Sequence, residues 1–292
     1  MKSNNQILSI KSNSLAEFSI WKLLIWLILV IFAALIIVPL IFMFTASIMP
    51  ATEILKMPYP WFTGKIHWQN YWNGIKGPYN SFIYLRNILN SLIVASSVTF
   101  TTVILSAITG YSLAKFDFKG KNLVFISIMA TMMVPFEAIM VPLYMVALNL
   151  GINDSYAGLI LPFLTNAFGI FMMRQYLLTF PDNMLDSARI DGAGELKIFW
   201  QIVLPNCKPV IATLAVLTFR TQWDNLLWPL MVIQSEEMKT IPLYITRFLA
   251  ETNTDEGIMM AIAATASIPI FILFFSMSKY FINSGVHSGS KS

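Results

Sequence analysis

Three charged residues, Glu137, Arg220 and Asp224, lie inside stretches that are otherwise almost entirely apolar. Charged side chains are rare in lipid, and those that occur usually face a cavity, a partner helix or each other. Arg220 and Asp224 stand at i and i+4, a spacing that allows an ion pair on one helix face. Alternatively, Asp224 lines a translocation path with Trp223 and Asn225, because a carboxylate, an amide and an aromatic face suit a sugar. Glu137 could line the same path or pair with another subunit.

Motifs for catalysis are missing from the sequence. A phosphate-binding loop needs an upstream glycine and a Ser or Thr after Gly-Lys, whereas Gly64-Lys65 is followed by Ile66. The two histidines, His67 and His287, are far apart in sequence and are expected on opposite sides of a membrane. They therefore cannot share a metal site. The sequence predicts no enzymatic activity, no metal and no cofactor for this chain.

A polar segment, residues 181–205, separates two apolar runs. Asp182 can cap a short helix whose apolar residues include Leu185 and Ala188. Gly192 follows where a helix C-terminus favours a residue that adopts a positive φ without penalty. These positions predict one short helix that ends in a glycine elbow.

A second short helix is predicted after the elbow. Leu196, Phe199, Trp200 and Val203 fall at i, i+3, i+4 and i+7, which makes one apolar stripe, and Pro205 then breaks the pattern. A helix, elbow and helix outside the lipid would need a groove on a partner for this stripe. The alternative is an amphipathic loop that packs on its own bundle or on the lipid interface.

Composition places the whole chain in a membrane. Of its 292 residues 57% are hydrophobic and only 12% are charged, which is too apolar for a soluble domain of this size. Uncharged runs predict six spanning helices, over about residues 21–47, 86–115, 121–151, 154–174, 209–233 and 257–281. The expected fold class is all-α and polytopic, with an N-terminal tail over residues 1–20 and a single transmembrane domain over residues 21–292.

Basic residues indicate the orientation. The side that holds the N-terminus, the 181–205 segment and the C-terminus carries twelve Lys and Arg residues, and the other side carries six. Basic residues accumulate on the cytoplasmic side, so both termini and the polar segment are predicted to be cytoplasmic. The net charge of +4 follows from the same bias and does not indicate nucleic-acid binding.

Three further features have structural interpretations. Thr102, Ser106 and Gly110 form a ridge of small residues along which another helix can approach closely. Cys207 has no partner for an internal disulfide and is interpreted as a structural thiol. The aromatic-rich outer segment between Glu53 and Arg86 fits an interfacial belt, and part of it could dock an extracytoplasmic binding protein.

The polar segment resembles the characteristic cytoplasmic loop of permease subunits in binding-protein-dependent ABC importers. That family pattern is Glu-Ala-Ala, a glycine four residues after the last alanine, and later Ile-x-Leu-Pro; here the spacing is intact, with Asp and Ser replacing Glu and the first Ala. In the family this loop is the coupling helix, which docks in a cleft of the ATPase subunit. The resemblance assigns this contact to Asp186, Ser187, Ala188, Asp191, Gly192, Ala193, Leu204 and Pro205.

The resemblance extends from about residue 90 to the C-terminus. Residues 110–121, Met132–Pro135, Val141–Tyr144 and Trp223–Leu230 are similar to the second permease of the carbohydrate-uptake branch, the maltose-type subunit. This implies the type I importer permease fold in a prokaryotic inner membrane. It also implies as partners a second, different permease, two ATPase subunits and an extracytoplasmic solute-binding protein. The implied cargo is a sugar or oligosaccharide, with glycerol phosphate as the alternative in the same branch.

A different class of function is an ion-coupled secondary transporter, in which Glu137 and Asp224 would bind protons or cations. Such transporters use discontinuous helices in two repeated halves. The sequence shows no matching pair of segments broken by Gly or Pro, and that function leaves the amphipathic 181–205 segment unexplained.

Overall fold

The computed structural model describes the chain except for residues 1, 63, 78–81, 251–254 and 287–292, and its regular structure in the described part is helical throughout. It divides into two compact units. The first comprises residues 1–71 and 255–264, and the second comprises residues 72–254 and 265–292. The long helix α16 (Glu256–Val286) contributes to both units.

The first unit is held together where α1 (Lys2–Ser47) ends. Asn70 Nδ2 donates to the carbonyl oxygens of Ser47 and Met49 at 3.0 and 2.7 Å, which ties the start of α3 (Gln69–Lys76) to the end of α1. Gly257 lies so close that an added Cβ would stand 2.7 Å from the carbonyl oxygen of Met49. The short α2 (Ala51–Ile54) follows α1 and packs Ile54 on Met49.

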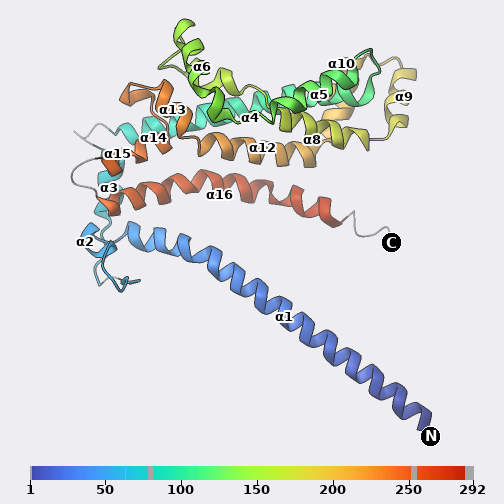
Figure 1. Cartoon of the computed structure of the whole chain (residues 1–292), viewed down its shortest axis with the longest axis horizontal. Coiled ribbons are helices and arrows are strands. Elements are labelled where there is room, and N and C mark those ends of the chain that lie inside the picture. The colour runs from blue at the N-terminus through green and yellow to red at the C-terminus, as the bar shows by residue number, and fades with distance from the viewer. Residues whose placement is uncertain (1, 63, 78–81, 251–254, 287–292) are drawn as a thin grey trace. The chain divides into compact units, whose positions relative to one another are not determined.

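Three helices, α4 (Ile83–Lys115), α8 (Ala167–Leu178) and α12 (Lys208–Trp223), run side by side in the second unit (Figure 1). The predicted ridge of small residues brings α8 onto α4. An added Cβ on Gly110 would stand 2.7 Å from Met173 Cβ, and one on Gly169 would stand 2.5 Å from Ser106 Oγ. Thr102 Oγ1 donates to the carbonyl oxygens of Phe163 and Leu164. The packing interpretation of the ridge is confirmed.

Two apolar cores lie at the two ends of α4. One contains Tyr111, Met173, Leu185, Phe199 and Cys207 with their neighbours, and joins α4 and α8 to the polar segment. The other surrounds Trp228 and joins α4 to α6 (Phe136–Asn149), α7 (Tyr156–Ile160), α13 (Leu227–Val232) and α14 (Ile241–Ile245). The η4 turn (Glu236–Met238) packs beside α4, and α15 (Arg247–Ala250) follows α14.

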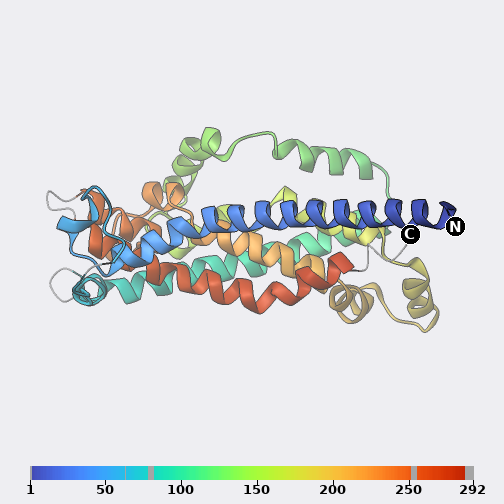
Figure 2. The ribbon, with the colours of Figure 1, turned by 90° about the horizontal axis from the view of Figure 1, so that it is seen from below.

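The predicted third span, residues 121–151, is not one straight helix. α5 (Lys121–Thr131) and α6 meet at an angle of 94°. Pro135 stands at the break with φ −65° and ψ 138°, and a proline disfavours helical backbone in the residue before it. Figure 2 shows the green α5 and α6 turning at this break. The segment expected as one spanning helix is therefore a bent pair of helices.

The predicted fourth and fifth spans are also interrupted. α7, the 3₁₀ turn η2 (Leu161–Phe163) and α8 form a pair bent by 43°. The fifth span, expected over residues 209–233, ends as a helix at Trp223, and α13 begins only at Leu227. In the part of the chain that the structure describes, three helices are long and apolar enough to cross a membrane, over Ile20–Ser47, Ile83–Lys115 and Glu256–Ser278. The number rises to six when each bent pair counts as one span, and the third such pair joins Glu195–Asn206 to α12.

Candidate functional site

The polar segment folds as predicted around a glycine elbow. α9 (Asp182–Ile190) ends in a Schellman motif: Ala193 N–H donates to the carbonyl of Ala188, and Gly192 N–H donates to that of Arg189, both at 3.0 Å. Gly192 has φ +81°, where a side chain costs about 1 kcal/mol or more. No atom lies within 4 Å of the position of an added Cβ. Any residue other than glycine would therefore be strained at this position, and the outer side of the elbow is open.

The second helix of the segment runs through α10 (Glu195–Ile198), the π-helical turn η3 (Phe199–Val203) and α11 (Leu204–Asn206). Pro205 stands inside α11, and the helix ends one residue later at Asn206. A π-helical turn changes the register of the hydrogen-bond ladder just where the missing N–H of proline would interrupt it. The bend of 77° comes after Asn206, so this helix is not collinear with α12.

The predicted apolar stripe of the second helix is divided between two faces. Phe199 and Val203 are buried in the second unit together with Ile198, whereas Leu196 is 78% exposed and Trp200 is 49% exposed. The helix is apolar around most of its circumference, so periodicity alone could not decide which face its own bundle covers. Together with Met184 and Ile190 of α9, Leu196 and Trp200 form an outer set of exposed apolar side chains, which we call the outer apolar set.

The residues assigned by resemblance divide in the same way. Ala188 is buried at 9% exposure and packs in the core of the second unit. Asp186, Ser187, Asp191, Gly192 and Pro205 are exposed, and Ser187 Oγ donates to the carbonyl of Asn183. Ala193 and Leu204 are half-buried. The exposed members are the ones that a partner could reach.

Asp182 does not cap α9 by a side-chain hydrogen bond, so that prediction was wrong. It is the first residue of the helix, and its carboxylate accepts from Lys115 Nζ at 2.6 Å. Lys115 also donates to the carbonyl of Phe180 at 2.7 Å. An ion pair between α4 and α9 therefore takes the place of the expected cap.

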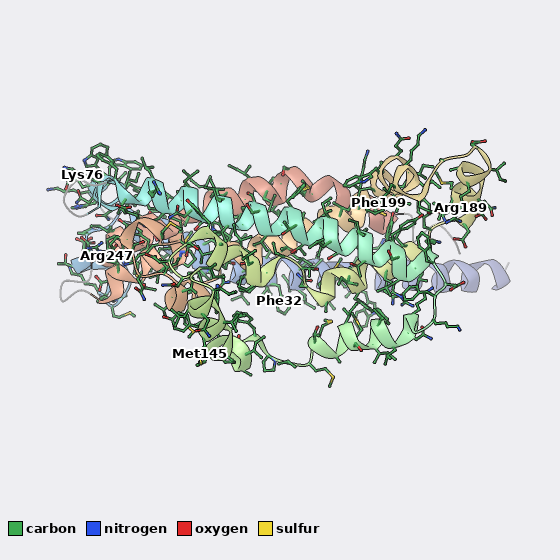
Figure 3. The ribbon with its side chains drawn as sticks, turned by 90° about the horizontal axis from the view of Figure 1, so that it is seen from above. Phe32, Lys76, Met145, Arg189, Phe199 and Arg247 are labelled. Carbon is green, nitrogen blue, oxygen red and sulfur yellow. The ribbon has the colours of Figure 1, made fainter. Side chains whose placement is uncertain are left out.

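A chain of charge-assisted hydrogen bonds, which we call the elbow network, joins both helices of the segment to α4. Arg189 donates from Nη1 to Asp186 Oδ1 at 2.9 Å and from Nε to Glu195 Oε1 at 2.8 Å. Tyr111 on α4 donates its hydroxyl to Glu195 Oε2 at 2.8 Å. The Arg189 hydrogen bond holds the pKa of Glu195 below its usual range, and the same bond raises the pKa of Arg189. Figure 3 shows Arg189 and Phe199 at the same end of the second unit.

A cleft of about 630 Å³ opens within the second unit where α6 starts and where the spans around α8 and α12 are interrupted. Its polar lining comprises Glu137, Thr165, Asn166, Thr218, Thr221, Gln222, Asp224 and Asn225. The remaining lining is apolar, with Phe136, Phe163 and Phe168 among it. The structure thus brings together Glu137, Asp224 and Asn225, three of the four residues that the sequence suggested for a path.

Trp223, the fourth residue, lies elsewhere. It is only 2% exposed, its ring stacks on Phe219 at 5.6 Å between centroids, and its indole N–H donates to the carbonyl of Ala266. Asp224 follows the last turn of α12, and its carboxylate lies 3.5 Å from Arg220 Nε. Both members of this pair are more than half exposed, so the ion pair and the cleft position of Asp224 occur together.

The chain matches the model of the binding-protein-dependent transport system inner membrane component family over residues 103–284. The chain belongs to this family. It is 33% identical over 277 residues to the arabinooligosaccharides transport system permease protein AraQ of Bacillus subtilis (strain 168), with 94% of this chain and 98% of that protein covered. It is also 33% identical over 267 residues to the sn-glycerol-3-phosphate transport system permease protein UgpE of Yersinia pestis bv. Antiqua (strain Antiqua), with 90% and 95% covered.

The fold is shared with a chain in the crystal structure of a bacterial ABC transporter involved in the import of the acidic polysaccharide alginate. The TM-score is 0.79 at 24% sequence identity, covering 90% of this chain and 96% of that chain. The all-α fold predicted from the resemblance is therefore confirmed. The chain is a multi-pass inner-membrane permease of an ABC transport system, a family that works in general with a partner permease, an ATPase and a solute-binding protein.

Proposed function

We propose that this chain is the permease subunit of an ABC importer that moves a sugar or oligosaccharide across the inner membrane. It acts beside a second, different permease, two ATPase subunits and an extracytoplasmic solute-binding protein. Hydrolysis of ATP takes place on the ATPase subunits, because the sequence has no phosphate-binding loop. Residues 1–20 form a cytoplasmic tail, residues 21–292 form one transmembrane domain, and both termini are cytoplasmic.

The observation that carries the coupling role is the open glycine elbow beside the outer apolar set. Ile190 is 85% exposed and Leu196 is 78% exposed, although they flank a polar elbow rather than a spanning segment. Exposed apolar side chains of this kind mark a surface that a partner covers. The segment 181–205 therefore docks in a cleft of the ATPase, with Asp186, Asp191, Gly192 and Pro205 at the contact.

The cleft supports a polyhydroxyl solute over a phosphate. Its lining combines hydroxyl, amide and carboxylate groups with aromatic faces, and it includes Glu137 and Asp224 but no Lys or Arg among the described residues. Carboxylates accept hydrogen bonds from sugar hydroxyls, and a lining without a basic side chain offers a phosphate no cationic partner. Glycerol phosphate remains the alternative cargo, and it would need its cationic partner from the second permease.

Gly192→Asp tests the coupling role. The substitution strains a backbone at φ +81° and adds a carboxylate to the docked face. We expect a near-normal amount of the subunit in the membrane, loss of uptake, and loss of the ATPase from the purified complex. Uptake of radiolabelled sugar and the amount of co-purified ATPase are measured together.

Gly120→Asp is the matched control. Gly120 also has a positive φ, +85°, with nothing within 4 Å of an added Cβ, but it lies between α4 and α5, outside the 181–205 segment. It should keep the ATPase and most of the uptake. Normal ATPase recovery and transport in Gly192→Asp would rule out docking at the elbow, and equal losses in both variants would mean that backbone strain alone is responsible.

A further inference from the structure

The elbow network links three elements that also share the apolar core at this end of α4. Arg189 belongs to α9, Glu195 to α10 and Tyr111 to α4. Arg189 and Glu195 are six residues apart, on opposite sides of the glycine elbow, so their contact fixes the angle between the two short helices. The Tyr111 hydroxyl then fixes α10 on α4. Bonds to ionised groups are stronger than neutral ones, which suits a joint that must transmit force.

Packing around Tyr111 holds this joint in place. Its ring lies 5.3 Å from that of Phe116 and 5.7 Å from that of Phe199, measured between centroids. The side chain is only 4% exposed, so the hydroxyl has little freedom to move away from Glu195. Lys115, one helical turn further along α4, adds the ion pair to Asp182 at the start of α9. This end of α4 is thus bound directly to the start of α9 and to α10, and through Glu195 to Arg189 near the end of α9.

Hydrogen bonds also hold the opposite end of α4. Asn90 Nδ2 donates to the carbonyls of Glu237 and Lys239 at 2.7 and 2.9 Å, and Ser91 Oγ accepts from the N–H of Ile241 at 2.8 Å. Asn90 and Ser91 are both buried. Figure 3 shows Lys76, near this end, far along the second unit from Arg189. α4 is therefore a continuous 33-residue helix with a polar clamp at each end.

We propose that Glu195, Arg189 and Tyr111 are positioning residues that convert movement of the docked elbow into a rigid-body movement of α4. The movement then reaches the segment from Glu236 to Ile241 at the other end of the helix. The inference rests on the proposed docking of the elbow on the ATPase but concerns a later step. Without the network the elbow can still dock on the ATPase. Its movement would then change the angles that α9 and α10 make with α4, and α4 itself would stay in place.

The test uses the assembled transporter in proteoliposomes, with uptake and ATP hydrolysis measured on the same preparation. Glu195→Gln keeps the shape of the side chain and removes its charge. We expect normal recovery of the ATPase and continued hydrolysis, but a fall of about threefold or more in solute moved per ATP, because a charge-assisted joint becomes a neutral one. Tyr111→Phe keeps the ring contacts and loses only the hydroxyl, and we expect a fall of about twofold.

Two further variants complete the design. The double variant Tyr111→Phe/Glu195→Gln should lose less than the product of the two single losses, because both changes act on the same hydrogen bond between Tyr111 and Glu195. Asp117→Asn is the matched control. It breaks the Lys121–Asp117 ion pair at 3.2 Å, in which Asp117 is fully exposed. The solute moved per ATP should stay unchanged.

The outcomes separate the two proposals. An unchanged ratio of solute to ATP in Glu195→Gln overturns the positioning role. If the Glu195→Gln transporter loses the ATPase on purification, Glu195 takes part in binding the ATPase. That result also overturns the inference, but the proposal that the elbow docks on the ATPase stands. If Glu195→Gln does not reach the membrane, Tyr111→Phe decides, since its ring packing is retained, and an unchanged ratio in that variant overturns the role.

Discussion

Trp223 and Asp224 are neighbours in the sequence but contribute to different properties of the protein. Trp223 is buried against Phe219 and bound to the carbonyl of Ala266, so it stabilises the contact between α12 and α16. Asp224 begins the break in the helix, faces the cleft and pairs with the exposed Arg220. Because the helix ends between them, one residue belongs to the packed bundle and the other to the cleft.

We predict that Trp223→Phe destabilises the subunit by ~1–2 kcal/mol, since it removes a buried hydrogen bond and part of a stacked ring. Thermal unfolding in detergent measures this loss. Asp224→Asn should leave unfolding unchanged, because an exposed ion pair contributes little, yet lower uptake of sugar about threefold or more by removing a carboxylate from the cleft.

Arg220→Gln is the control for this comparison. It breaks the same ion pair but leaves the carboxylate of Asp224 in the cleft, and uptake should stay near that of the wild type. Equal losses of uptake in Arg220→Gln and Asp224→Asn would assign the effect to the ion pair. The carboxylate of Asp224 would then have no role of its own in the cleft.

Local signals predicted part of the candidate site. The position of Gly192 relative to the apolar residues of α9 was enough to place a positive φ there, because a helix end imposes that conformation locally. The elbow network was not predictable in the same way. Tyr111 and Glu195 are 84 residues apart, and both Glu195 and Arg189 look like solvated charges until the fold brings them together. The faces of the second helix also depend on tertiary packing.

At the scale of helices, the interrupted spans determine where the cleft lies. The break at Pro135 places Glu137 in the first turn of α6, the break before α8 places Asn166 as its N-cap, and the break after Trp223 exposes Asp224. Non-helical backbone at membrane depth occurs where it is buried in protein or lines a water-filled cavity. Uniform apolar composition predicted that these segments are apolar enough to span but not where they bend, because hydropathy does not record backbone direction.

The contact between α4 and α8 gives a prediction at this scale. Gly110→Ala places a Cβ 2.7 Å from Met173 Cβ and 2.9 Å from the backbone nitrogen of Arg174, so one helix must shift. We expect a loss of ~1–3 kcal/mol in stability, measured by thermal unfolding in detergent. Gly64→Ala is the control, since nothing lies within 4 Å of its added Cβ. Equal melting temperatures for both variants would contradict the close approach of the two helices.

For the whole molecule, the distribution of charge is the main evidence on orientation. Twelve basic residues are expected on the side of the 181–205 segment and six on the other. The structure places the segment at one end of α4 and the residues from Glu236 to Ile241 at the other, which agrees with a helix that crosses the membrane between them. The charge bias predicts that the end with the 181–205 segment faces the cytoplasm.

Cysteine labelling in intact cells tests this orientation. Asn73→Cys and Asn183→Cys place single thiols at exposed positions, and the unmodified chain is the control because its own Cys207 is fully buried. An impermeant maleimide should label Asn73→Cys from outside and should label Asn183→Cys only after the cells are permeabilised. The reason is that the basic residues around the 181–205 segment hold it on the cytoplasmic side. Labelling of Asn183→Cys in intact cells, with Asn73→Cys protected, would reverse the topology and place the elbow where no ATPase could reach it.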